Sequence, residues 1–140
     1  MDRSPLRLLH MATEIADYAF SSGVAGATPR QFAVLVAIDE NEGASQQTLS
    51  ERTGIDGATL GQIIRRLVLR NLIRRRRSDR DRRAYAVKLT SKGRHLLRRA
   101  KPLARRVDQR VLSALPKNRR ERFLDLLAAI PGKLDSDRTT

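Results

Sequence analysis

Seven arginines lie within residues 72–90, in the stretch LIRRRRSDRDRRAYAVKLT. An arginine side chain stays charged at neutral pH and presents its N–H donors in a planar fork, which suits phosphate oxygens and the acceptor edge of guanine. This segment could therefore bind a nucleic acid, but runs of like charge are also typical of solvated loops. The charge of the rest of the chain decides between these two interpretations.

The net charge of +14 is concentrated in one part of the chain. Residues 1–61 carry 4 basic and 8 acidic side chains, whereas residues 62–110 carry 19 basic and 3 acidic ones. A concentrated positive field attracts a polyanion, and a merely basic protein does not need such segregation. Aromatic residues make up only 4% of the chain, which argues against stacking platforms for single strands. We therefore expect double-stranded DNA as the partner.

The other reactive residue types form no catalytic or metal-binding pattern. Cysteine is absent, which excludes a disulfide framework, a thiolate nucleophile and a cysteine-based zinc site. Neither His10 nor His95 has an acidic or cysteine partner at convincing ligand spacing, and no nucleophile-elbow sequence is present. We therefore expect no enzyme activity, no metal and no cofactor.

The length of 140 residues predicts one compact domain or one protomer of a small oligomer, and the hydropathy pattern predicts a cytoplasmic protein. His10, Glu14 and Asp17 interrupt the N-terminal segment, which thus lacks the apolar core of a secretory signal. The longest fully apolar run, FAVLVAI, is too short to cross a bilayer. No membrane partner is expected.

Capping residues and apolar spacing predict the helices that position the arginines. A T-x-x-Q capping box at residues 28–31 precedes a helix that is apolar on all sides, which indicates a helix at the centre of a domain. Ser45 and Gly54 bound a short helix. Asp56 then caps an amphipathic helix with an exposed basic face, and Asn71 can adopt the left-handed conformation that ends it.

A β-hairpin is predicted after these helices. Tyr85, Val87 and Leu89 alternate with small or charged residues, which is the period of a half-buried strand, and Ile73 belongs to its antiparallel partner. The arginine-rich segment between them is too polar for a core and forms the tip. Thr90 then caps a long helix with an apolar seam, and a further helix with one apolar face follows it.

This order of elements places the second of two helices where it can enter a major groove, with a basic hairpin beside it. Three stretches make the chain resemble the MarR family of winged helix-turn-helix regulators: TPRQFAVLVAI, TGIDGATLGQIIRRLVLRNLIRR and DRRAYAVKLTSKG. The last stretch is the most specific. The family pattern of Asp, any residue, Arg, an alternating strand, then Leu-Thr and Gly maps onto Asp81, Arg83, Leu89, Thr90 and Gly93.

The resemblance implies a mainly α (α+β) fold, a winged helix-turn-helix with N- and C-terminal dimerisation helices. Residues 1–27 would hold the N-terminal dimerisation helix, and residues 28–90 the DNA-binding lobe. Residues 91–133 would hold the C-terminal dimerisation helices, and we expect the tail, residues 134–140, to be disordered. A homodimer is therefore the expected assembly.

The resemblance also implies which side chains reach DNA. Ala58, Thr59, Gly61 and Gln62 occupy the family's base-facing places, and glutamine favours adenine as a bidentate partner. Arg80 and Arg82 are expected in a narrow minor groove, whereas Asp81 and Arg83 would organise the wing. The complete set of expected DNA contacts is Ser45, Gln46, Gln47, Ala58, Thr59, Gly61, Gln62, Arg65, Arg66, Arg74, Arg75, Arg76, Arg77, Arg80, Arg82 and Arg83.

Members of this family often bind small aromatic acids between the dimerisation helices and the DNA-binding lobe. The residues expected to line such a pocket are His10, Tyr18, Phe20, Arg30 and Phe32, unless the aromatic rings are core and the polar groups its rim. The resulting hypothesis is a dimeric, ligand-responsive repressor that recognises a pseudo-palindromic operator. The alternatives are a non-specific architectural nucleic-acid-binding protein and a scaffold protein that binds others through its dimer helices.

Overall fold

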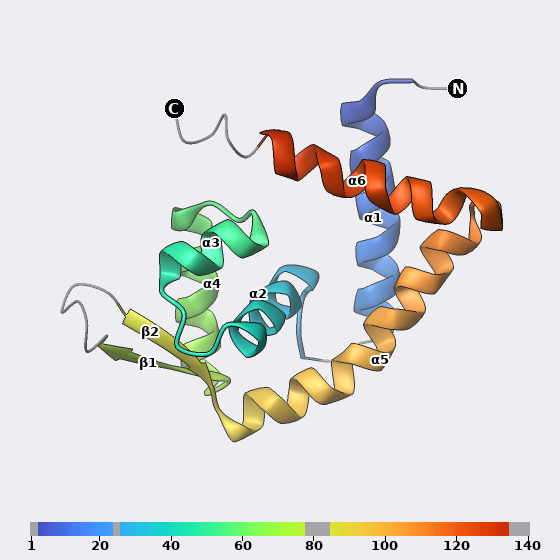
Figure 1. Ribbon diagram of the computed structural model, residues 1–140. Coiled ribbons are helices and arrows are strands. Elements are labelled where there is room, and N and C mark those ends of the chain that lie inside the picture. The colour runs from blue at the N-terminus through green and yellow to red at the C-terminus, as the bar shows by residue number, and fades with distance from the viewer. Residues whose placement is uncertain (1–2, 24–25, 78–84, 135–140) are drawn as a thin grey trace.

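The computed structural model describes residues 3–23, 26–77 and 85–134. Helices α2, α3 and α4 and the β1–β2 hairpin form one lobe, whereas α1 packs against α5 beside it and α6 follows the end of α5 (Figure 1). The elements are α1 (Pro5–Gly23), α2 (Pro29–Glu40), α3 (Gln46–Thr53), α4 (Gly57–Leu69), β1 (Ile73–Arg77), β2 (Tyr85–Leu89), α5 (Ser91–Ser113), the 3₁₀ turn η1 (Lys117–Arg119) and α6 (Arg120–Leu134). The expected winged helix-turn-helix order is confirmed.

Four helices begin at the residues that the sequence predicts. The side chains of Thr28, Ser45, Asp56 and Thr90 each accept a hydrogen bond from the backbone amide three residues later. The Thr28 amide in turn donates to Gln31 Oε1 at 3.1 Å, which completes the capping box of α2. A cap of this kind contributes about 1 kcal/mol, so these residues fix where each helix starts.

The core of the lobe surrounds α2, as expected from its apolar sequence. Val34, Leu35 and Ile38 are almost completely buried, and they pack against the apolar sides of α3, α4, α5 and the hairpin. The remaining buried members of this core are Ala37, Leu49, Leu60, Ile63, Ile64, Leu67, Leu72, Ile73, Val87 and Leu97. The apolar side of α4 is therefore held by the core, which leaves its opposite side outward.

The predicted hairpin forms with an antiparallel register that pairs Ile73 with Leu89 and Arg77 with Tyr85. We call the β1–β2 hairpin the wing. A further bridge joins Ser45 to Ala86, with the Val87 amide donating to the Ala44 carbonyl at 3.2 Å. The sequence did not predict this bridge, which ties the wing to the start of α3.

The wing is anchored to α5 at its base. Asn71 has a φ of 59°, so the left-handed end predicted for α4 is confirmed. The Thr90 hydroxyl donates to the Asn71 carbonyl at 2.6 Å, and the Thr90 amide donates to the Leu72 carbonyl at 3.0 Å. A Cβ atom on the buried Gly93 would lie only 2.0 Å from the Leu72 carbonyl oxygen. Only glycine therefore allows α5 to approach the backbone this closely.

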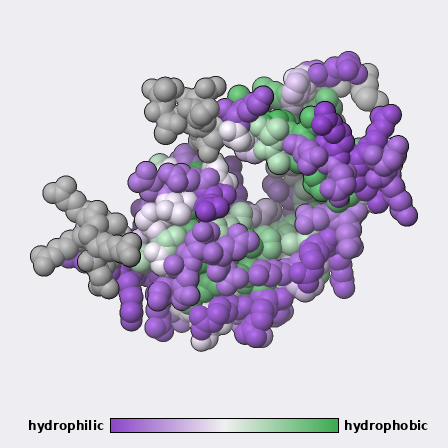
Figure 2. Space-filling model, in the orientation of Figure 1, coloured by the Kyte–Doolittle hydropathy of each residue, from purple (hydrophilic) through white to green (hydrophobic). Residues whose placement is uncertain are grey.

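Helices α1 and α6 expose apolar side chains. In α1, Leu6 and Tyr18 are 80% and 78% exposed, and no described residue of α6 is buried. Figure 2 shows apolar surface in the upper part of the molecule, where α6 crosses in front of α1 in this view. The remaining large exposed apolar residues of the two helices are Leu8, Leu9, Met11, Ile15, Leu124, Leu126, Leu127, Ile130 and Leu134. Exposed apolar surface of this extent is typical of a protein interface.

None of the helices in the described ranges is both long enough and apolar enough to cross a membrane.

Candidate nucleic-acid interface

The outward side of α4 presents a stripe of four exposed residues at intervals of four, three and four: Ala58, Gln62, Arg65 and Leu69. Residues at these intervals lie above one another on a helix, so the stripe runs along the helix axis. We call these four residues the reading stripe. Arg66 is also exposed beside it. The stripe combines one amide side chain with one permanent positive charge, which can contact base edges and phosphates respectively.

Two of the predicted base-facing residues lie off the reading stripe. The Thr59 side chain is half-buried, and its hydroxyl donates to Asp56 Oδ2 at 2.8 Å within the cap of α4. Gly61 is buried, and a Cβ there would lie 3.3 Å from Gln46 Nε2. These two residues therefore support the start of α4 and its contact with α3. Their part in base contact stays a prediction.

The start of α3 lies beside the wing. Ser45 caps α3, contacts the Thr48 hydroxyl at 3.1 Å and bridges to Ala86 of β2, so structural roles account for its position. Gln46 is half-buried against Gly61, and Gln47 is exposed. Of the three residues predicted in this segment, Gln47 is the one most open to a phosphate.

Strand alternation divides the four arginines of β1 between two faces of the wing. All four are exposed. Ile73 points into the core, so Arg75 and Arg77 share its face, whereas Arg74 and Arg76 point the opposite way. The Arg75 guanidinium carbon lies 6.0 Å from the centre of the Tyr85 ring, a cation–π contact. The predicted contacts Arg80, Arg82 and Arg83, and the predicted wing-organising pair Asp81 and Arg83, lie outside the described residues.

One arginine has a structural role that the sequence did not reveal. Arg70, at the C-terminal end of α4, donates to the carbonyl of Gly26 and to Gln31 Oε1. The two partners lie 44 and 39 residues away, so no local pattern points to them. Because Gly26 lies between α1 and α2, this contact ties the end of α4 to the connection between the two helix groups.

A cavity of about 570 Å³ lies between α1, the start of α2 and the turn before α4. We call it the α1–α4 cavity. Its lining residues are Thr13, Asp17, Pro29, Arg30, Ala33, Thr53, Gly54, Ile55, Asp56 and Thr59. Arg30 was expected in a ligand pocket and lies in this one. Its other polar groups, including Asp56 and Thr59, connect the cavity directly to the cap of α4.

The other residues expected in the ligand pocket lie elsewhere. The rings of Phe20 and Phe32 contact each other with centres 5.2 Å apart, in the apolar cluster that joins α1, α2 and α5. His10 and Tyr18 are exposed on α1. In the described part of the chain, no three His, Asp or Glu side chains converge as metal ligands would.

Comparison with known proteins identifies the family. A sequence model described as MarR family matches residues 25–84. The transcriptional regulator HosA of Escherichia coli is 34% identical over 100 residues, which cover 71% of this chain and 74% of HosA. The chain belongs to the MarR family.

Solved structures of two regulators extend the similarity over almost the whole chain. The transcriptional repressor CouR, solved with a 23-mer DNA duplex, is 35% identical, with a TM-score of 0.81 over 91% of this chain and 92% of CouR. BpsR of Bordetella bronchiseptica, whose DNA binding is regulated by 6-hydroxynicotinic acid, is 29% identical, with a TM-score of 0.80 over 89% of this chain and 96% of BpsR.

Membership of the MarR family gives the general function. MarR-family proteins are homodimeric, DNA-binding regulators of transcription and not enzymes. The recognition, fold class and DNA partner expected from the sequence are therefore confirmed. A homodimer can cover exposed apolar surface such as that of α1 and α6. That these two helices form the dimer interface stays a prediction.

Proposed function

We propose that this MarR-family protein is a homodimeric repressor that recognises a pseudo-palindromic operator and releases it when a small acidic ligand binds. The observation that carries the proposal is the reading stripe of α4 beside an arginine-covered wing, on a lobe whose neighbouring helices expose apolar surface. In the dimer, two copies of α4 would enter successive major grooves about 34 Å apart. Residues 1–27 and 91–133 would then form the dimer interface, and residues 28–90 the DNA-binding lobe.

In this arrangement the two sides of the wing differ in role. Arg75 and Arg77 lie on the face of β1 that α4 also packs against, so they are the arginines of β1 that we assign to phosphates of the operator. Gln62 is the residue of the reading stripe that we assign to a base, with adenine as its preferred partner. Arg65 and Arg66 would position the helix through phosphates.

Binding measurements on two DNA fragments test sequence recognition. The dimer should bind the region upstream of its own gene with higher affinity than a scrambled duplex of equal length, both at physiological salt. Specific sites are typically bound about 10³-fold or more tightly than non-specific DNA. Equal affinity for the two fragments would instead support the architectural nucleic-acid-binding alternative.

Replacing Gln62 should change specificity more than stability. The side chain is exposed, so Gln62→Ala should leave the melting temperature close to that of the wild type. Loss of one bidentate base contact should weaken binding to the best operator by about 1–3 kcal/mol and relax the preference at one base pair of each half-site. Selection of binding sites from a random duplex library, with both proteins, measures this. An unaltered base preference in the variant would remove Gln62 from the base contacts.

The α1–α4 cavity is the site that we assign to the effector. Its volume falls in the range that is usual for small-molecule sites. Arg30 offers a cation for a carboxylate, whereas Asp17 offers an acceptor for a hydroxyl or N–H group. This set fits a hydroxylated aromatic acid, the chemical class to which the BpsR ligand 6-hydroxynicotinic acid belongs.

The position of the cavity suggests how ligand binding would weaken DNA binding. Asp56 and Thr59 belong both to the cavity lining and to the cap of α4, while Thr13 and Asp17 belong to α1. A ligand that contacts both sides would favour one orientation of the lobe relative to the dimer helices. If the favoured spacing of the two α4 helices does not match successive major grooves, the population shifts away from the DNA-binding state.

Arg30→Gln should uncouple the ligand from DNA binding. In the wild type, a saturating hydroxylated aromatic acid should weaken operator binding by about 5- to 150-fold. The variant should bind the operator with the wild-type affinity and lose most of this response. Arg30→Lys keeps the charge and should retain part of it, while Arg52→Gln, an exposed change outside this cavity, should retain all of it. A full response in Arg30→Gln would place the effector site elsewhere.

A further inference from the structure

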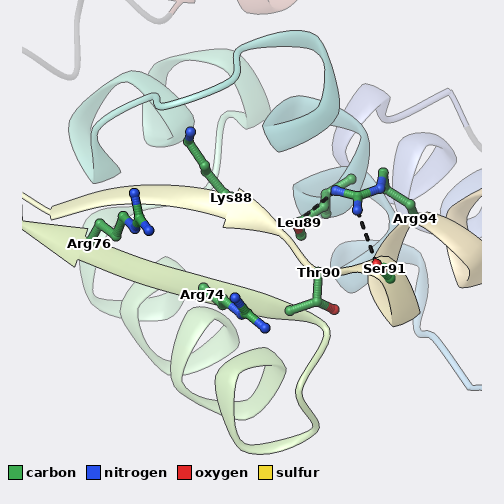
Figure 3. A pocket seen from close by; sticks show the side chains of 7 residues that line it. All are labelled: Arg74, Arg76, Lys88, Leu89, Thr90, Ser91 and Arg94. Atoms are coloured by element: carbon green, nitrogen blue, oxygen red, sulfur yellow. Dashed lines mark hydrogen bonds between the residues drawn. The ribbon is translucent and has the colours of Figure 1, made fainter.

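A basic hollow of about 260 Å³ lies at the base of the wing (Figure 3). Its lining comes from β1, β2 and the first turn of α5, so it joins both strands of the wing to the helix that follows them. The seven lining residues are Arg74, Arg76, Lys88, Leu89, Thr90, Ser91 and Arg94. Four of them are cations, two carry hydroxyl groups and none is acidic.

The basic hollow lies on the face of the wing that points away from the core. Ile73 and Val87 point from the wing into the core that also holds the apolar side of α4. Strand alternation directs Arg74, Arg76 and Lys88 to the opposite face. None of the residues of the reading stripe lines the hollow. The α1–α4 cavity shares none of its lining residues.

Arg94 is held in position before any ligand binds. Its two terminal nitrogens donate to the Leu89 carbonyl at 3.1 Å and to the Ser91 hydroxyl at 3.2 Å. A guanidinium group has five N–H donors, so donors remain for a ligand. Because the side chain is already fixed, binding costs less conformational entropy.

Within the described ranges, no strong ion pair neutralises the remaining charges around the hollow. Lys88 lies 3.9 Å from Glu42, but the two side chains are 46% and 80% exposed, and a pair this open contributes little. Thr90 and Ser91 lie at the N-terminal end of α5, a helix of 23 residues whose dipole adds a partial positive charge there. Four neighbouring cations repel one another, and a multiply charged anion between them would remove this repulsion.

We propose that the basic hollow binds one phosphate-bearing anion per subunit, at a site separate from the reading stripe and from the α1–α4 cavity. The anion would contact Arg74 and Arg76 of β1, Lys88 of β2 and Arg94 of α5. These contacts would hold both strands of the wing against the start of α5. The phosphate group could belong to a small soluble molecule or to the backbone of DNA that extends past the operator. Both sources present the same oxygen acceptors to arginine.

Pyrophosphate titration of the full-length dimer tests this site. At constant ionic strength, calorimetry should give saturable binding of one pyrophosphate per subunit. A 100-fold excess over the dissociation constant should raise the melting temperature by about 5–10 °C. Sodium chloride at equal ionic strength should not reproduce this rise. Absence of saturable binding would overturn the proposal.

A matched pair of double variants locates the binding. Arg76→Gln/Arg94→Gln removes two charges of the hollow, and pyrophosphate affinity should fall by about tenfold or more, the usual effect of losing charged hydrogen bonds. Arg77→Gln/Arg99→Gln removes two exposed charges from the same strand and the same helix but outside the hollow, and affinity should stay close to that of the wild type. Equal losses in the two double variants would overturn the site. The single Arg76→Gln variant keeps both hydrogen bonds of Arg94 and gives the same test if the double variant unfolds.

The source of the phosphate follows from the same titration in the presence of a DNA fragment that the dimer binds. Unchanged pyrophosphate affinity in the complex would support a soluble ligand, because the site then remains open. Competition between long duplexes and pyrophosphate, but not between short duplexes and pyrophosphate, would support a backbone phosphate beyond the operator. Either outcome supports the site, and neither depends on the effector proposed for the α1–α4 cavity.

Discussion

Gly93→Ala is expected to destabilise the fold by about 3 kcal/mol or more, which would lower the melting temperature by roughly 10 °C. The added Cβ would lie 2.0 Å from the Leu72 carbonyl oxygen, a backbone atom that cannot turn aside. Separation of α5 from the wing would also lengthen the 3.0 Å hydrogen bond between the Thr90 amide and the same carbonyl. Thermal unfolding followed by circular dichroism measures the effect.

Gly132→Ala provides the control for this prediction. Gly132 lies in α6, and a Cβ atom there would have no neighbour within 4 Å. Alanine has a higher helix propensity than glycine, so this variant should be neutral or more stable by up to about 1 kcal/mol. If the melting temperature of Gly93→Ala lay within 2–3 °C of that of the wild type, the fold would not require the close packing of α5 on the base of the wing.

Operator affinity is expected to fall by about three to five orders of magnitude between 50 and 200 mM monovalent salt, if the dimer neutralises about six to ten phosphates. Arg75 and Arg77 of β1 together with Arg65 and Arg66 provide four exposed positive charges in each protomer, or eight in the dimer. Each phosphate contact releases counterions from DNA, so the logarithm of the binding constant decreases linearly with the logarithm of the salt concentration. Fluorescence anisotropy with a labelled operator measures the slope.

Charge variants assign part of this slope to the wing. The dimer contains two copies of the wing, so each phosphate contact that the Arg75→Gln/Arg77→Gln variant loses per subunit removes two contacts from the complex. For each such loss, the magnitude of the slope of log K against the logarithm of the salt concentration should decrease by about 2 units. Arg105→Gln, an exposed change on α5 away from the wing, should leave the slope unchanged. A slope in the wing variant equal to that of the wild type would show that these two arginines do not bind phosphates.

The parts of the fold that depend on neighbouring residues could be predicted from the sequence. The caps at Thr28, Ser45, Asp56 and Thr90 act within one helical turn, so their sequence signals carry the physics that forms them. The left-handed residue Asn71 belongs to the same class. The family pattern added the arrangement of these elements, which local signals alone do not determine.

Contacts between distant segments could not be predicted in this way. The Ser45–Ala86 backbone bridge and the Arg70–Gly26 hydrogen bond join residues about 40 positions apart. Nothing in the residue types at these positions indicates which distant residue they contact. Orientation within α4 was also only partly predicted. Ala58 and Gln62 lie on the reading stripe, but Gly61 faces α3 because the apolar side of α4 must meet the core.

The identical residues of β1 have a consequence for how the wing keeps its alignment. Four consecutive arginines follow Ile73 in β1. If β1 shifted by one residue relative to β2, each arginine would move to the other face of the wing and a neighbouring arginine would take its place. Electrostatics therefore cannot favour one alignment over the other. The burial of Ile73, which is 1% exposed, distinguishes them, because a shift would move its side chain into water. The burial of Ile73, together with the hydrogen bond from the Thr90 amide to the Leu72 carbonyl, thus selects which guanidinium groups face the duplex and which face the basic hollow.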